Sequence, residues 1–223
     1  MVVTGHLLAD ELIKQGGTES IPWKDKTHTL KRVIWAPHHS ILDEDSLNYS
    51  NFLVIAEDML KLVTCYEDRI EFAFKPHPVL KRKLYNHKNW GVEKTDQYYQ
   101  RLANAKNSIY VEGDYATLFR TSDAMIHDCS TFTAEYLYTK NPTMFVSKQN
   151  RRDCFNDFGH KCLEQHYIGH SIEDIISFIN DVVLKGDDYM KDGREKFFKE
   201  YLLPPSGERS SYNMYKEFVT EIK

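Results

Sequence analysis

Paired cysteines are absent from this sequence. The four cysteines, Cys65, Cys129, Cys154 and Cys162, are scattered and form no C-x-x-C pair. Cysteine-ligated zinc sites and small disulfide-rich domains depend on such pairs, so we expect four reduced thiols. The sequence therefore predicts no metal site and no cofactor.

Long hydrophobic runs are missing too. No stretch approaches the ~20 consecutive apolar residues of a membrane-spanning helix, and the N-terminus lacks the basic, apolar and small-residue succession of a secretion signal. The chain has 223 residues, of which 41% are hydrophobic, and this is enough to bury a core. We expect a soluble, globular, cytoplasmic protein.

The sequence has no excess of positive charge. The formal net charge is −4 and the pI is about 6.2, which argues against a nucleic-acid-binding surface, and nucleic acid is not an expected partner. A local basic cluster contains Lys75, Lys81, Arg82 and Lys83. It can serve one anionic ligand or contact the inner membrane surface, although the commoner alternative is a solvated helix end.

The common nucleotide fingerprints are also lacking. There is no G-x-G-x-x-G after a strand and no G-x-x-x-x-G-K-[ST], so neither an ordinary NAD-dependent dehydrogenase nor a P-loop NTPase is indicated. Ser130 does not lie in G-x-S-x-G, which leaves a serine hydrolase unsupported.

Short apolar runs alternate with amphipathic segments along most of the chain. We expect strands at residues 32–36, 70–74, 108–111, 124–126 and 142–146, helices at 48–64, 79–85, 95–103, 114–120 and after Ser130, and a mostly helical tail over 151–223. This alternation implies right-handed βαβ crossovers and a parallel sheet with helices on both faces. The predicted fold class is therefore α/β and Rossmann-like.

Both ends of the chain differ from this central part. Residues 2–5 have the pattern of a strand end and turn, and residues 6–14 that of a short amphipathic helix. We interpret residues 1–31 as a linker and a helix that lead in from another, N-terminal domain. Residues 32–205 then form the nucleotide-binding domain, and residues 206–223 form a C-terminal helix.

Polar side chains gather where the predicted strands end. They are His38 and His39 after the first strand, Lys75 and His77 after the second, and Asp128, Ser130, Thr131 and Glu135 after the fourth. The carboxyl ends of parallel strands share one edge of a sheet, so we expect these side chains to meet in a single crevice. The hydroxyls of Ser130 and Thr131 would bind a phosphate at the start of a helix, and Glu135 would bind ribose hydroxyls. The alternative is a simple helix cap with a solvated Glu135.

The segment Lys75-Pro76-His77-Pro78 is the more specific signal. Its two prolines keep the backbone extended and present Lys75 and His77 in a fixed geometry. A cation and an imidazole held in this way suit a diphosphate, because they neutralise charge as the bond to a leaving group breaks. A rigid surface turn is the alternative.

Several motifs together resemble the carboxyl-terminal half of the CDP-glycerol glycerophosphotransferases, the family of teichoic-acid polymerases and primases with a GT-B fold. They are Lys75-Pro76-His77-Pro78, Ser122-Asp123 through Asp128-Cys129-Ser130-Thr131 and Glu135, Asn141-Pro142, and Gly207-Glu208-Arg209-Ser210-Ser211. The opening Val3-Thr4-Gly5-His6 resembles the segment that crosses between the two domains of that family. The order and spacing match over essentially the whole chain.

The resemblance implies the donor domain of such an enzyme, with cytidine diphosphate bound between the edge turns. Ser130 and Thr131 would contact the diphosphate, Glu135 would lie near the ribose, and His77 would be the catalytic residue that assists phosphate transfer. His38, His39, Lys75 and Asp128 complete the expected site.

The implied partners are CDP-glycerol or another nucleotide-activated donor, a polymer or lipid-linked acceptor, and an N-terminal domain that carries the base. Without that domain we expect this chain to bind the donor and turn nothing over. The implied location is the cytoplasm, with peripheral attachment to the cytoplasmic face of the membrane as an option.

Two departures from the family pattern leave alternatives open. Pro37-His38-His39-Ser40 stands where the family commonly has an aromatic residue or threonine followed by arginine, so another activated polyol or sugar is also a candidate donor. Asp128-Cys129-Ser130-Thr131 replaces Asp-Tyr-Ser-Ser but keeps the hydroxyls. Other classes that fit are a sugar-nucleotide-binding GT-B glycosyltransferase, an enzyme like UDP-N-acetylglucosamine 2-epimerase, and a non-catalytic Rossmann-like interaction domain.

Overall fold

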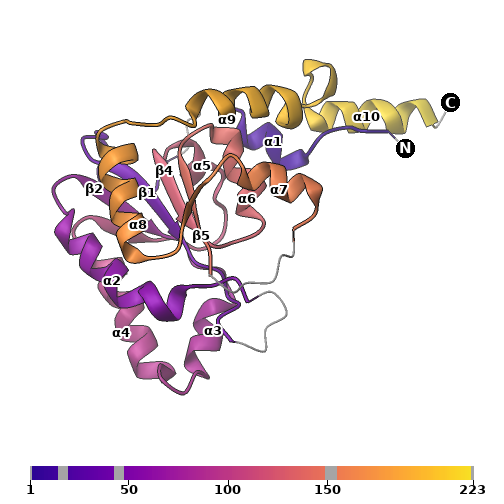
Figure 1. Ribbon diagram of the computed structural model, residues 1–223. Coiled ribbons are helices and arrows are strands. Elements are labelled where there is room, and N and C mark those ends of the chain that lie inside the picture. Colours follow the sequence, from indigo (N-terminus) through magenta and orange to yellow (C-terminus); the bar gives the residue numbers. More distant parts are fainter. Residues whose placement is uncertain (1, 15–19, 43–47, 149–154, 222–223) are drawn as a thin grey trace.

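A parallel β-sheet forms the centre of the protein (Figure 1). The computed structural model describes residues 2–14, 20–42, 48–148 and 155–221. Within these residues the sheet has six strands in the order β3-β2-β1-β4-β5-β6, and every neighbouring pair is parallel. The strands are β1 (Lys31–Ala36), β2 (Ile70–Phe74), β3 (Ser108–Tyr110), β4 (Ala124–His127), β5 (Thr143–Val146) and β6 (Tyr167–Gly169). The predicted Rossmann-like α/β class is confirmed.

The first five strands agree with the sequence prediction, a sixth strand was not predicted, and the strand end expected at residues 2–5 was wrong. The tail, expected to be mostly helical, also contains the strand β6, which pairs with β5 through Met144 and Tyr167. Its three residues end in a glycine and carry too short a pattern to be recognised without the partner strand. Residues 2–5 form no strand. Strand pairing, rather than local propensity, decides both cases.

The helices occupy the connections between the strands and much of the tail. They are α1 (Leu7–Leu12), α2 (Phe52–Cys65), α3 (Leu80–Tyr85), α4 (Gly91–Asn104), α5 (Ala116–Arg120), α6 (Phe132–Glu135), α7 (Asp157–Leu163), α8 (Ile172–Ser177), α9 (Lys191–Phe197) and α10 (Ser210–Glu221). A short 3₁₀ turn, Tyr136–Thr139, follows α6. In the described part of the chain, none of these helices has the length and apolar character to cross a bilayer.

The sheet has an apolar layer on each face. Trp35 belongs to the layer under α2, α4 and α8, and its ring lies 5.8 Å from that of Phe52 and 5.0 Å from that of Phe74. Ile34 points to the other layer, which includes residues of α1, α5 and α9 and the fully buried Trp23. Alternate residues of one strand therefore serve opposite faces, which confirms that helices cover both (Figure 1).

The cysteines Cys65, Cys129 and Cys162 are free thiols, as expected. Cys154 lies outside the described residues. Helix α1 and Trp23, which lie in the segment interpreted from sequence as a linker, contribute to the second apolar layer.

Two buried histidines lie side by side behind the carboxyl edge of the sheet. The ring centroids of His127, at the end of β4, and of His166, before β6, are 5.3 Å apart. Burial lowers the pKa of both imidazoles, that of His166 to about 4, and the charge of Arg194 acts in the same direction on His166. Both rings are therefore neutral in the folded protein at neutral pH.

We expect this pair to make the fold acid-sensitive. Below the ordinary histidine pKa of about 6.5, His127 and His166 are protonated in the unfolded chain but stay neutral in the folded chain. The free energy of unfolding therefore falls as the pH drops from about 6.5 to about 4. His166 alone accounts for about 3 kcal/mol over that window. Urea unfolding of the unchanged protein and of the variant His166→Gln, measured between about pH 6.5 and about pH 4, gives the free energy of unfolding as a function of pH. The contribution of His166 is the difference between the two slopes. An equal slope in both proteins would contradict the assignment.

Candidate functional site

The loops that follow β1, β2 and β4 meet at the carboxyl edge of the sheet, because these strands are neighbours. Backbone hydrogen bonds extend the β1–β2 ladder into the loops: Lys75 N–H donates to the Trp35 carbonyl at 2.8 Å, and His77 N–H donates to the Pro37 carbonyl at 3.0 Å. The extended conformation predicted for the Lys75–Pro78 segment is thus fixed by pairing as well as by proline.

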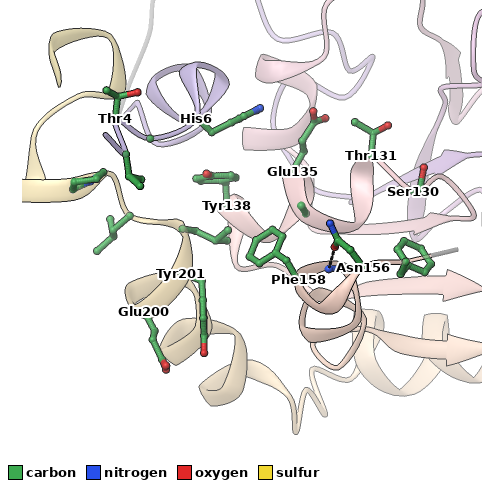
Figure 2. Close-up of a pocket in the computed structure, with 18 of the residues that line it drawn as sticks. Thr4, His6, Ser130, Thr131, Glu135, Tyr138, Asn156, Phe158, Glu200 and Tyr201 are labelled. Atoms are coloured by element: carbon green, nitrogen blue, oxygen red, sulfur yellow. Dashed lines mark hydrogen bonds between the residues drawn. The ribbon is translucent and has the colours of Figure 1, made fainter. Parts of the chain in front are cut away.

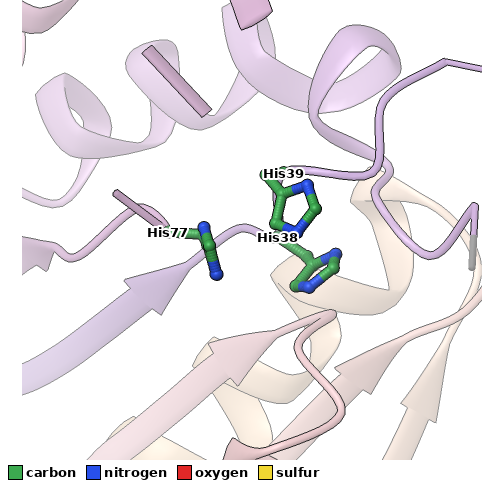
Figure 3. A group of neighbouring side chains, drawn as sticks. All are labelled: His38, His39 and His77. Atoms are coloured by element: carbon green, nitrogen blue, oxygen red, sulfur yellow. The ribbon is translucent and has the colours of Figure 1, made fainter. Parts of the chain in front are cut away.

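Three imidazoles predicted for the site come together at this edge (Figure 3). The ring centroid of His39 lies 4.2 Å from that of His38 and 4.2 Å from that of His77, and the centroids of His38 and His77 are 5.2 Å apart. Nδ1 of His77 accepts a hydrogen bond from Val79 N–H at 3.1 Å. Burial, together with the positive charges of Lys75 and Lys83, lowers the pKa of His77 to about 4. At neutral pH His77 is therefore a neutral imidazole.

Lys75 is buried beside the same loop. Its ammonium donates to the Gly113 carbonyl at 3.1 Å and lies 5.5 Å from the centre of the Tyr115 ring. Burial lowers the pKa of Lys75, and the nearby carboxylates of Glu112 and Asp114 oppose that shift. The cation predicted from sequence is thus held in place at the edge by a carbonyl and an aromatic face.

Asp128 has a different geometry from that of a ligand-binding carboxylate. Its Oδ1 accepts the backbone N–H of His38 at 2.5 Å, and its Oδ2 accepts the backbone N–H of Asn51 at 2.7 Å. The residue is almost fully buried. Burial raises the pKa of Asp128 to about 7, against the two N–H donors, which favour the charged form. Asp128 therefore joins the loop after β1 and the residue before α2 to the end of β4.

Ser130, Thr131 and Glu135 line a cavity of about 1080 Å³ (Figure 2). Thr131, directly before α6, makes no capping hydrogen bond with its side chain, so the capping alternative finds no support at this residue. The other walls of the cavity come from distant parts of the chain and include His6, Tyr138, Asn156, Phe158 and Tyr201. The cavity thus presents the hydroxyls of Ser130 and Thr131 and the carboxylate of Glu135 beside several aromatic rings.

Lys75 and His77 line a second cavity, of about 310 Å³, together with Lys81 and Glu112. Five of the sequence-predicted residues therefore face two cavities rather than the single crevice expected, and His38, His39 and Asp128 line neither of the two. Tyr115 connects the two sets, because its hydroxyl donates to Oε2 of Glu135 at 2.7 Å while its ring faces the Lys75 ammonium.

Sequence reasoning missed Tyr115. The residue follows β3 directly before α5, which is the same kind of strand-end position that identified the other candidates. The signal was therefore present, but we applied the strand-end argument only to β1, β2 and β4. Burial raises the pKa of Glu135, and the Tyr115 hydrogen bond opposes this shift. The hydrogen bond from Tyr115 therefore favours the charged form of the Glu135 carboxylate.

Solved structures with the same fold are enzymes about twice as long as this chain. The UDP-GlcNAc 2-epimerase from Neisseria meningitidis bound to UDP-GlcNAc is 14% identical, with a TM-score of 0.51, over 86% of this chain and 45% of the epimerase. A putative UDP-N-acetylglucosamine 2-epimerase from Listeria monocytogenes is 16% identical, with a TM-score of 0.58, over 98% and 53%. The wall teichoic acid polymerase TagF is 14% identical, with a TM-score of 0.54, over 97% and 49%. No curated protein matches the chain.

The fold and these neighbours define the class: a Rossmann-like α/β domain that corresponds to one half of a GT-B enzyme. Within that class the family is shown by sequence. The family model for CDP-glycerol:poly(glycerophosphate) glycerophosphotransferase matches residues 18–216, and the chain belongs to this family. It spans about half the length of the solved structures that it resembles.

Proposed function

We propose that this chain is the donor-nucleotide-binding domain of a transferase that uses CDP-glycerol, or a related CDP-polyol, to extend a cell-envelope polymer. The observation that carries the proposal is the family match over residues 18–216. The similarity to TagF supports it, since one TagF structure comes from a crystal soaked with CDPG. The remaining half of such an enzyme supplies the acceptor site, and the isolated chain then binds the donor without turnover.

The edge residues have distinct roles in this proposal. An acceptor hydroxyl gives its proton to a base in the other half of the enzyme and attacks the phosphorus that carries the glycerol. The bond from that phosphorus to the bridging oxygen breaks, and CMP leaves with the new negative charge. His77, with its Nδ1 occupied by Val79 N–H, directs an Nε2–H donor at the reacting phosphate. The Lys75 cation lies on the same loop. Both groups stabilise charge that grows in the transition state.

The large cavity accommodates the rest of the nucleotide. Ser130 and Thr131 donate hydroxyl hydrogen bonds to diphosphate oxygens, and Glu135 accepts from the ribose, with Tyr115 holding its carboxylate. Asp128 fixes the position of His38 and His39 through the backbone and contributes to binding indirectly.

Calorimetric titration of the 223-residue chain tests donor binding. We expect heat with CDP-glycerol, weaker binding of CMP because it lacks the second phosphate, and no binding of UDP-GlcNAc. Glu135→Gln removes an anionic acceptor with little change of shape and is expected to weaken CDP-glycerol about tenfold. The absence of both heat and a thermal shift with every nucleotide would count decisively against the proposal.

A second candidate function is an activity like that of UDP-N-acetylglucosamine 2-epimerase. The structural similarity to such epimerases favours it, including one bound to UDP-GlcNAc. Tighter binding of UDP-GlcNAc than of CDP-glycerol, followed by formation of the 2-epimer by the native enzyme, would establish this alternative.

The lipid-linked acceptor of the proposed reaction would bring the enzyme to the cytoplasmic face of the membrane as a peripheral protein. Helix α3 offers less free charge for this contact than its sequence indicates, because the Lys81 ammonium pairs with Asp96 at 3.0 Å. Subcellular fractionation, with and without high salt, tests the assignment.

A further inference from the structure

The histidine cluster has the composition of a metal site. His38, His39 and His77 each offer one ring nitrogen, and these three nitrogens lie within 4.8 Å of one another. The residues come from the loops after two neighbouring strands, β1 and β2 (Figure 3). Neither loop carries a ligand spacing that can be recognised in sequence, and only the parallel pairing of the strands brings the rings together.

The backbone of the cluster is already ordered. Asp128 accepts the N–H of His38 at 2.5 Å, and His77 N–H donates to the Pro37 carbonyl at 3.0 Å. Nδ1 of His38 lies 2.8 Å from Ser40 Oγ, which is the outer partner that a metal-bound imidazole needs for its second nitrogen. A ligand binding here therefore has to fix few additional torsions.

We propose that His38, His39 and His77 together bind one Zn²⁺ ion, each through one ring nitrogen. Three imidazoles select a borderline transition-metal ion, whereas Mg²⁺ and Ca²⁺ prefer oxygen ligands. In a tetrahedral zinc site the ligand nitrogens are about 3.4 Å apart, so modest side-chain rotations close the present separation. The fourth position remains open to water or to an anionic oxygen.

Neighbouring charges set the strength of the site. The positive charges of Lys75 and Lys83 act on His77 and oppose the binding of a further cation. When the metal binds Nε2 of His77, the ring proton lies on Nδ1, which then no longer accepts the Val79 N–H. The zinc-bound His77 therefore cannot also donate an Nε2–H to the reacting phosphate. The site is therefore weaker than a structural zinc site with four protein ligands.

Metal binding is tested on the chain itself, free of any polyhistidine tag and stripped with a chelator. Zn²⁺ is titrated in competition with a chromophoric chelator, and Co²⁺ is followed by its visible absorption. We expect one ion per chain, a rise in melting temperature with Zn²⁺, and a loss of affinity of at least about tenfold in His39→Asn and in His77→Asn.

His28→Asn is the matched control. It removes one exposed imidazole at the opposite edge of the sheet, and asparagine tolerates the positive φ of 56° at that position. This variant is expected to bind Zn²⁺ as the unchanged chain does. Equal affinity in His77→Asn and in His28→Asn would overturn the proposal.

A measurement on the unchanged chain keeps the proposal testable if the ligand variants fold poorly. X-ray absorption of the zinc-loaded chain is expected to show three imidazole nitrogens, and fewer than three would overturn the assignment. The inference goes beyond the proposed function and does not depend on it. If the chain binds Zn²⁺ but not CDP-glycerol, only the donor proposal is contradicted. If it binds CDP-glycerol but not Zn²⁺, only the metal proposal is contradicted.

Discussion

Replacing Asp128 by alanine is expected to lower the free energy of unfolding by about 2–6 kcal/mol and to abolish donor binding. The change leaves the backbone N–H groups of His38 and Asn51 buried without their carboxylate acceptors, and each such group costs about 1–3 kcal/mol. Whole domains are stable by only about 5–15 kcal/mol. Urea unfolding measures the first effect, and calorimetry with CDP-glycerol at a temperature where the variant is folded measures the second.

Asp123→Ala provides a matched control for this variant. Asp123 also accepts a backbone N–H from β1, that of Arg32 at 2.7 Å, but it does so at the opposite edge of the sheet and is partly exposed. We expect a smaller loss of stability and unchanged donor binding. Equal losses of binding in both variants would show that Asp128 acts through global stability and does not position the site.

Most of the fold could be predicted from the sequence because the sheet is largely buried on both faces. Val33 and Ile34 face different apolar layers, so β1 appears as a continuous hydrophobic run that is easily recognised. The strand β6 lacks this property, since Ile168 is exposed, and its assignment depends on pairing with β5. The predicted helix at 48–64 begins only at Phe52, and Asn48, with a positive φ of 37°, has a backbone conformation that an α-helix does not contain.

The sequence predicted that the candidate residues lie at one edge of the sheet, but it did not predict which cavity each side chain faces. Strand order places His77 beside His39, and the strand-end argument anticipates this contact. It does not anticipate that Glu135 turns to a different cavity, because the direction of a side chain depends on Tyr115 and on walls formed by residues from the two ends of the chain. The strand-end argument also does not distinguish Asp128, whose two carboxylate oxygens accept backbone N–H groups, from residues that are available to a ligand.

Replacing His77 by asparagine is expected to lower kcat for glycerophosphate transfer by about 10²–10⁴-fold while the Kd for CDP-glycerol changes less than about tenfold. The imidazole lies in a fixed orientation, because Val79 N–H holds Nδ1 and the His77 backbone pairs with Pro37. A donor fixed in this way acts mainly on charge that appears in the transition state. The assay uses the native enzyme with its acceptor domain, and initial rates separate kcat from KM.

The control for this prediction is again His28→Asn, which removes an imidazole far from the edge loops and is expected to leave both constants unchanged. A His77→Asn enzyme with full kcat would favour the non-catalytic interaction domain, because in that case the edge histidines have no role in the reaction. A rise in KM at constant kcat would instead assign His77 to ground-state binding of the donor. Only a loss confined mainly to kcat supports a role for this imidazole at the reacting phosphate.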